Sequence, residues 1–249
     1  PAVLGGQARS GPLRELSTDR PDATESPFTV DAGHLQLELD AGRYTRDRRD
    51  GVRTTEWVVA PFNLRFGLTA DVEAGIFVVP HVRLTEQARG GPRTTVRGGG
   101  DVILRTKRNL SGNDGGPFAL GVLADLKLPT AGDGIGNDKV EGAVAVPVAY
   151  ELTGGWEGAA MTSVALAHTG AGRRAVWINT ITFGHDLAPG LGGFFELTSA
   201  AGDGAHAATF NCGFTRRVGP GLQLDCGVNL GLSRAAPDLG VFAGLARKF

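Results

Sequence analysis

The chain has 249 residues, with 25 Lys and Arg against 26 Asp and Glu, and a formal net charge of -1. This balance lacks the basic surplus that nucleic-acid binding needs, so we expect no nucleic-acid partner. Nowhere does the sequence approach the roughly 18 to 20 unbroken apolar residues of a membrane-spanning helix. The 39 glycines and 13 prolines, without a collagen-like period, predict many turns and few helices.

Residues 1–31 form a polar leader. Its stretch TDRPDATESPFT, from Thr18 to Thr29, contains Pro21 and Pro27. Proline fixes φ, lacks an N–H and pushes the residue before it into an extended conformation. The leader is therefore predicted to be neither helix nor central strand, but a stiff tether whose role depends on the fold of residues 32–249.

From His34 to the C-terminus, apolar and polar side chains alternate in run after run. Such alternation predicts strands with one apolar and one polar face, because successive side chains point to opposite sides. The runs are residues 34–40, 58–68, 72–83, 102–107, 118–127, 140–152, 156–168, 174–185, 193–199, 208–215, 222–232 and 240–249. The faces of 156–168 and 174–185 are not cleanly separated. An unbroken phase would place Val58 with Phe62, and Glu73 with His81 and Arg83.

We interpret residues 32–249 as an all-β fold, a single up-and-down antiparallel transmembrane β-barrel of about twelve strands. Runs of about ten residues suit tilted strands that cross a bilayer, and tight connections largely alternate with longer loops, as in outer-membrane barrels. A soluble β-sandwich would alternate in the same way. Aromatic residues near the tight turns favour the barrel, because they resemble an interfacial girdle. These residues are Phe66, Phe118, Tyr150, Trp156, Phe183, Phe214 and Phe249.

In a barrel whose apolar side chains face lipid, the polar positions of the runs point into the lumen. The predicted lumen-lining residues are Glu38, Asp40, Asn63, Arg65, Glu73, Asp101, Arg105, Lys107, Asp125, Lys127, Glu141, Asn211, Gln223, Asp225 and Asn229. Twelve strands lie between the filled eight-stranded barrel and the open channel of sixteen to eighteen strands, which favours a narrow or gated pore. The leader then becomes a candidate lumen plug, in which Asp19, Arg20, Asp22 and Glu25 meet charges of the wall or cap turns.

The leader resembles the opening of the bacterial outer-membrane family named for the meta-pathway of phenol degradation and often labelled "transporter". NLRFGLTADVEAGI, GGGDVILRTKRNL, LADLKLPTAGDGIG and the final LQLDCGVNLGLSRAAPDLGVFAGLARKF agree with it. The resemblance implies an outer-membrane β-barrel and no catalytic residues. The terminal Phe249, in phase with Val241 and Leu245, also resembles the last-strand signature of bacterial outer-membrane barrels.

Catalysis, cofactors and metals find little support in the sequence. No histidine among His34, His81, His168, His185 and His206 has a serine two residues away, so we expect no enzyme and no cofactor. The loop from Thr130 to Gly142 weakly resembles a calcium-binding loop but lacks the spacing of an EF-hand. We therefore expect no metal site.

Two further features leave alternatives open. Cys212 and Cys226 would lie opposite each other in a hairpin symmetric about Gly219, either as free thiols or as a cross-strand disulfide. The segment from Arg43 to Arg53 either touches anionic lipopolysaccharide or is a charged hairpin tip.

The expected function is passive passage of small molecules, aromatic or otherwise apolar ones included, across a bacterial outer membrane, with both termini periplasmic. The expected partners are membrane lipid, lipopolysaccharide, a small solute and envelope proteins. The alternative is a closed structural barrel that anchors or joins a larger envelope assembly.

Overall fold

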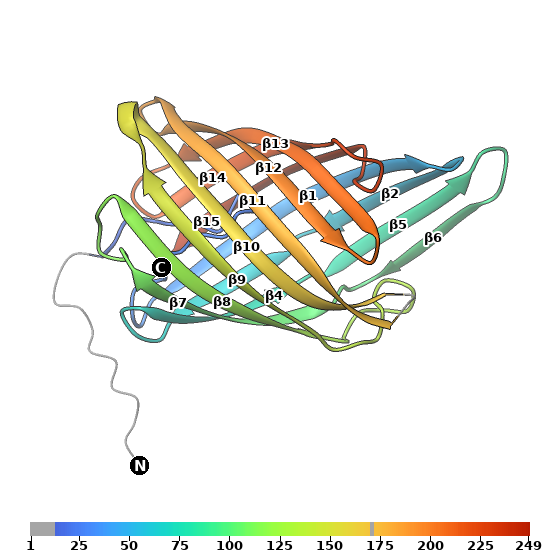
Figure 1. The fold of residues 1–249 in the computed structure, drawn as a ribbon, viewed down its shortest axis with the longest axis horizontal. Helices are drawn as coiled ribbons and strands as arrows, with labels where there is room; N and C mark the ends of the chain where they lie inside the picture. The colour runs from blue at the N-terminus through green and yellow to red at the C-terminus, as the bar shows by residue number, and fades with distance from the viewer. Residues whose placement is uncertain (1–12, 170–171) are drawn as a thin grey trace, which may run out of the picture.

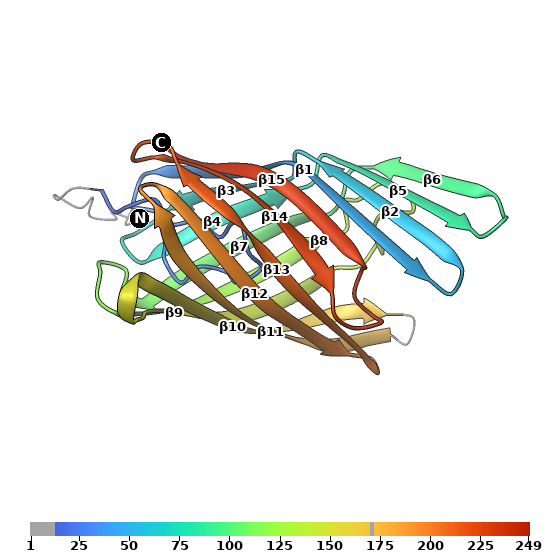
Figure 2. The same ribbon diagram turned by 90° about the horizontal axis from the view of Figure 1, so that it is seen from above.

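The computed structural model describes residues 13–169 and 172–249, so the first twelve residues of the leader lie outside it. These residues form a closed, antiparallel, twelve-stranded barrel (Figures 1 and 2). Its fifteen strand segments are β1 Leu35–Arg49, β2 Val52–Val59, β3 Phe62–Gly67, β4 Val72–Val78, β5 His81–Ala88, β6 Arg93–Gly98, β7 Val102–Ser111, β8 Phe118–Leu128, β9 Glu141–Glu151, β10 Trp156–Thr169, β11 Gly172–Ala188, β12 Leu191–Gly202, β13 Ala205–Arg217, β14 Leu222–Gly231 and β15 Leu239–Lys248.

Pairing between the first and last strands closes the sheet. β15 runs antiparallel to β1 from the pair Gln36–Lys248 to the pair Arg46–Leu239. The final residue continues this contact, since the Phe249 N–H donates to the Leu35 carbonyl at 2.9 Å. The soluble sandwich is therefore excluded and the predicted fold class is confirmed. Within the described residues, no helix is long and apolar enough to cross a membrane.

Four adjacent barrel strands change course at one level. β2 and β3 are separated by Ala60 and Pro61, β4 and β5 by residues 79–80, and β6 and β7 by residues 99–101. The neighbouring β1 has a register shift between Asp40 and Gly42. Each β2–β3, β4–β5 and β6–β7 pair thus forms one interrupted barrel strand, which reconciles fifteen segments with twelve strands. Proline and glycine mark such interruptions. Proline cannot donate a hydrogen bond to a central ladder, and glycine weakens a strand.

These breaks overturn the unbroken phase expected for residues 58–68 and 72–83. Val58 is buried and pairs with Arg43 and Val82, whereas its neighbour Val59 is exposed. Ala60 and Pro61 lie outside the ladder and interrupt the regular alternation. Val58 therefore lies on the opposite face from Phe62.

The same reset moves His81 and Arg83 away from the face of Glu73. His81 pairs with Val59 and Arg83 with Trp57, both exposed residues on the outer surface. Beyond the breaks, β2, β5 and β6 extend the sheet at the end opposite the C-terminus (Figure 1). We call this part, together with the distal half of β1 (residues 42–49), the sheet extension.

Elsewhere the two faces of the wall differ sharply. Its largest fully buried side chains include Arg65, Lys107 and Glu73, which point inward, whereas Leu104, Val144 and Leu224 are exposed on the outside. This inversion of the usual burial pattern is that of a barrel surrounded by lipid.

Candidate functional site

Residues 13–33, which comprise the described part of the leader and the two residues after it, lie inside the barrel at the end that carries the C-terminus (Figures 1 and 2). This segment has no regular secondary structure apart from a single bridge between Ala32 and Gly67. Its prolines explain this conformation, and several of its backbone N–H groups donate to side chains of the wall or of the segment itself.

Arg20 joins this segment to two strands of the wall. Its Nη2 lies 2.5 Å from Asp225 Oδ1 on β14, and its Nη1 forms an ion pair with Asp40 on β1. Gly244 on β15 makes room for the guanidinium, because a Cβ at that position would lie 2.3 Å from Arg20 Nη2. Asp40 also receives Arg43 Nη2 at 2.8 Å.

Asp19 lies between the cations of two further strands. Lys107 on β7 donates to Asp19, and Arg65 on β3 lies 3.3 Å away. The Asp19 N–H in turn donates to Glu38 at 3.1 Å. Burial alone would raise the pKa of Asp19, but the neighbouring cations outweigh it and hold that pKa well below its usual range, so the carboxylate stays charged.

Arg65 is the centre of the wall network. Its Nη1 lies 2.7 Å from Glu38, its Nε lies 2.8 Å from Glu73, and its Nη2 donates to the Phe28 carbonyl at 3.0 Å. Arg65 and its three partners come from four parts of the chain, namely β3, β1, β4 and the segment. The side chains of Arg65, Glu38 and Glu73 are at most 2% exposed. Breaking such a buried network by removing one charge is strongly destabilising, about 3–5 kcal/mol.

Glu25 extends the contacts to β7 and β8. Arg105 Nη1 lies 2.6 Å from Glu25, while Arg105 Nε lies 2.7 Å from Asp125 on β8. Glu25 and Asp125 therefore share one arginine.

Glu196 on β12 holds the far side of the segment. It accepts hydrogen bonds from the Thr24 N–H at 2.8 Å, from the Thr24 hydroxyl at 2.6 Å and from the Ala23 N–H at 3.0 Å. Asn211 Nδ2 donates to Oε2 of Glu196 at 2.7 Å. Glu196 was not among the predicted lumen residues, although it is the single charged residue in the run 193–199.

Asp22 differs from Asp19, Glu25 and Asp31 because it forms no ion pair with a described cation and lies beside an acid. Its neighbours include the carboxylate of Glu196 and the hydroxyl of Thr182 on β11. Burial, and next the charge of Glu196, raise the pKa of Asp22 to about 8.

The end of the segment is fixed at the barrel rim. Asp31 receives Arg14 Nε at 2.7 Å and Lys248 Nζ at 2.5 Å, and the Val30 N–H donates to Glu73 at 2.8 Å. The polar groups of the segment thus contact polar side chains on at least seven strands of the wall.

The remaining predicted lumen residues also occupy inward positions. Asn63, Asn211 and Gln223 are buried, and Asn229 pairs in register with Asn211. Asp101 is the one member outside a strand: it lies in the β6–β7 break, where it accepts from the N–H of Thr130 and contacts Lys127 at 3.1 Å. Lys127 also pairs with Glu141 at 2.9 Å.

The aromatic residues predicted as a girdle all lie near the rim that carries the C-terminus. Six of them are exposed outward and Phe183 is half-buried. Trp156 and Phe183 contact Phe195, at ring-centroid distances of 6.1 and 5.4 Å, so Phe195 belongs to the same cluster.

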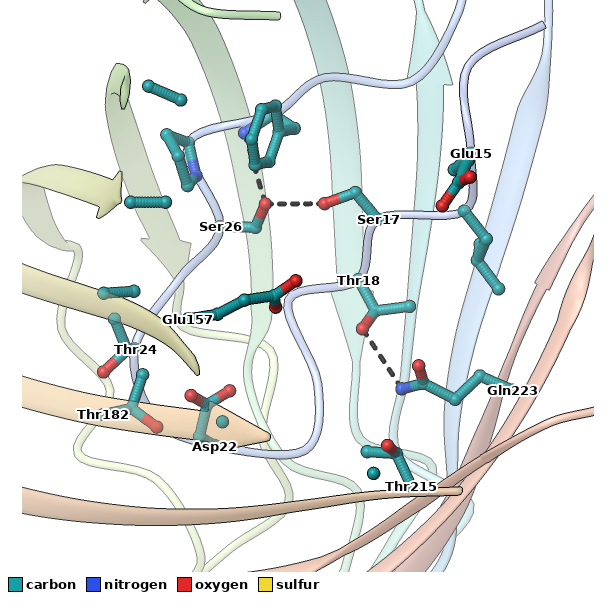
Figure 3. Close-up of a pocket in the computed structure, with 18 of the residues that line it drawn as sticks. Glu15, Ser17, Thr18, Asp22, Thr24, Ser26, Glu157, Thr182, Thr215 and Gln223 are labelled. Carbon is teal, nitrogen blue, oxygen red and sulfur yellow. Dashed lines mark hydrogen bonds between the residues drawn. The ribbon is translucent and has the colours of Figure 1, made fainter. Parts of the chain in front are cut away.

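A cavity of about 760 Å³ lies between the segment and the wall. Figure 3 shows Asp22 beside Thr182, with Glu157 and Thr24 on the same side, and Gln223 hydrogen-bonded to Thr18 across the cavity. Phe28 and Phe194 add ring surface to this polar lining. The volume falls in the range of small-molecule sites, roughly 300–1,000 Å³.

Among the described residues, no group of three His, Cys, Asp or Glu side chains is placed to hold a metal ion. One serine–histidine contact does occur, between Ser199 Oγ and His206 Nε2 at 2.9 Å across the β12–β13 hairpin. It lies away from the cavity, and within the described chain no acid contacts the other imidazole nitrogen.

The two cysteines are free. They are not directly opposite, because Cys212 pairs with Val228 and Cys226 with Phe214. The expected symmetry about Gly219 was wrong, since the turn closes between Val218 and Leu222.

A family described as "Putative MetA-pathway of phenol degradation" matches residues 18–249. Among solved structures, the NanC porin aligns at a TM-score of 0.55 and 8% identity, over 85% of this chain and 100% of that one. The β domain of the Bordetella autotransporter BrkA aligns at 0.57 and 15%, over 88% and 100%. The CymD monoaromatic hydrocarbon channel aligns at 0.51 and 8%, over 88% and 89%. These likenesses establish the fold. No curated protein matches the chain.

Proposed function

The chain belongs to the family described as "Putative MetA-pathway of phenol degradation", and we propose that it is a passive outer-membrane channel for small molecules whose lumen is plugged by its own N-terminal segment. The observation that carries this proposal is the polar wall around a polar segment. Charged side chains that face each other across a lumen suit an aqueous path once the segment moves.

The ionic contacts favour a plug over a permanent filling. Some of these contacts join a residue of segment 13–33 to the wall, whereas others, such as the pair Arg65–Glu73, lie within the wall and persist without the segment. The barrel thus keeps partners for part of its buried charge when the segment leaves.

The cavity supports small solutes that combine a ring or apolar body with a polar group. Phe28 and Phe194 offer apolar surface, and Asp22, Thr24 and Thr182 offer hydrogen-bonding groups. The family's description and the shared fold of CymD, a monoaromatic hydrocarbon channel, agree with aromatic solutes.

The orientation is inferred from the loops. We place both termini and the tight turns in the periplasm and the sheet extension outside the cell, because outer-membrane barrels keep their short turns on the periplasmic side.

Conductance in planar bilayers tests the plug. Deleting residues 1–27 removes Asp19, Arg20 and the backbone partners of Glu196, and we expect single-channel conductance to rise several-fold. Deleting residues 1–12 alone is the matched control, because it leaves every described contact in place. Equal conductance of the two deletions would show that the segment does not block the pore.

Liposome swelling tests the channel itself against the closed structural barrel. A channel should admit solutes up to a size limit, and the 1–27 deletion should raise that limit. A barrel that admits no solute in either form would support the structural alternative.

A further inference from the structure

The outward face of the sheet extension carries six arginines and no acidic residue. Residues directly opposite in a ladder share a face, so the register assigns them to one surface together with Tyr44 and Trp57. The acids of these strands, Asp47, Glu56 and Glu86, occupy the other face. The arginines are Arg46, Arg48, Arg53, Arg83, Arg93 and Arg97.

Like charges are placed directly against each other on this surface. Arg48 is the register partner of Arg53, and Arg83 is the register partner of Arg97. Directly opposed like charges destabilise a sheet. Two such pairs on one face therefore call for an anion that bridges them.

The described residues supply no such anion. Arginines on the inner face of the same strand are paired, Arg43 with Asp40 and Arg49 with Asp47. On the outer face, no ion pair between described residues involves any of the six. The Nε of Arg46 is buried without a hydrogen-bond partner in the described chain.

The arginines continue the lipid-facing surface at its outer end. Arg46 pairs with Leu239 and Tyr44 with Val241, which belong to the outward apolar face of β15. The rings of Tyr44 and Trp57 contact each other at 4.8 Å between centroids, and such rings prefer the level of lipid head groups. The surface is thus apolar at its lower end and cationic beyond it, with Arg83 and Arg97 in the same ladder row as Tyr44 and Trp57.

We propose that this surface, the arginine face, binds the phosphorylated head group of lipopolysaccharide. Lipid A combines two phosphates on one disaccharide with acyl chains, which matches guanidinium groups directly above an apolar belt. Arginine binds phosphate in a bidentate manner, and neighbouring strands at about 4.8 Å spacing allow two guanidinium groups to reach one phosphate. A phospholipid offers one phosphate and spans fewer of these groups. The proposal rests on the orientation given above, which turns the extension toward the outer leaflet.

Native mass spectrometry of the full-length protein, purified in detergent and titrated with bisphosphorylated lipid A, tests this binding. We expect one or more bound molecules, and at least a tenfold weaker apparent Kd for R53Q/R83Q/R97Q. The matched control is R108Q/R216Q/R247Q, which removes three outward arginines at the opposite rim and should change the Kd less than twofold. R53K/R83K/R97K keeps the charge and should lose less affinity than the glutamine variant, and far-ultraviolet circular dichroism confirms folding of all three.

Phosphatidylglycerol and inorganic phosphate distinguish the sources of the phosphate. We expect both to bind more weakly than lipid A and added salt to weaken all binding. Equal lipid A affinity in the wild type and the glutamine variant, or phosphatidylglycerol binding as tight as lipid A, would overturn the proposal. So would loss of binding in the opposite-rim control alone. Liposome swelling by the same variants is a separate readout: a conducting barrel that ignores lipid A contradicts only the arginine face, and a sealed barrel that binds lipid A contradicts only the channel.

Discussion

Arg20 and Asp225 lie 205 residues apart in sequence and form a two-point ion pair inside the barrel, with Nη2–Oδ1 at 2.5 Å and Nε–Oδ2 at 3.2 Å. Asp225 is fully buried at its side chain and Arg20 is 13% exposed. Removing either charge would leave the other one buried without a counter-ion, so this pair holds the segment at the wall.

Arg20→Gln is expected to loosen the segment. It leaves Asp225 without its cation, whereas Asp40 keeps Arg43, so docking should weaken by about 3–5 kcal/mol. Limited proteolysis should cut within residues 13–31 sooner, and conductance should rise. Arg108→Gln is the control, because its pair with Asp71 is exposed at the same rim and contributes less than about 1 kcal/mol. Equal proteolysis of both variants would contradict a latch at Arg20.

The pH dependence of the channel should follow Asp22. Its raised pKa, about 8, means that the docked segment binds a proton more readily than the released segment does. Docking is therefore fully favourable below the ordinary carboxyl pKa near 4 and weakens as pH rises toward 8. We expect conductance to increase between about pH 4 and pH 8 and to level off above pH 8.

Asp22→Asn should remove the part of this pH dependence that extends to pH 8, because the amide stays neutral and keeps its place beside Glu196. Burial also raises the pKa of Glu25 to about 7, so a dependence that ends near pH 7 should remain. Asp71→Asn is the control. A hydrogen bond from Thr69 lowers the pKa of Asp71, so that group stays charged over the whole range and its replacement should leave the profile unchanged. A pH profile of Asp22→Asn that matches the wild type would rule out this carboxyl as the sensor.

Much of the wall was predictable because alternation has a physical cause that acts locally. The inward positions of Glu38, Arg65 and Asp225 come from period two alone. Glu196 was missed because its importance depends on where a distant, irregular segment lies. The phase of Val58 failed because the sequence was interpreted as one strand, although Pro61 and Pro80 are recognisable interruptions. The offset of Cys212 from Cys226 depends on turn geometry, which the residue spacing did not specify.

The free cysteines give a test of which face meets lipid. Cys226 is exposed between the outward residues Leu224 and Val228, and Cys212 is half-buried on the same surface. In proteoliposomes, a membrane-soluble maleimide should label Cys226, and a charged, impermeant maleimide should react at least tenfold more slowly. Detergent-denatured protein should react with both reagents at both cysteines without prior reduction. Fast labelling by the charged reagent in proteoliposomes would contradict a lipid-facing β14.

The break between β2 and β3 stores backbone strain at one residue. Ala60 has a φ of 54°, a left-handed conformation that costs a residue with a Cβ about 1–2 kcal/mol. Ala60→Gly removes this cost but adds roughly 0.4–1 kcal/mol of unfolded-state entropy, so we expect a net stabilisation of up to about 1 kcal/mol. Ala74→Gly, within the regular strand β4, should instead destabilise by about 0.5–1 kcal/mol. Thermal unfolding in the same detergent compares the two, and a lower midpoint for Ala60→Gly than for the wild type would show that the positive φ carries no strain.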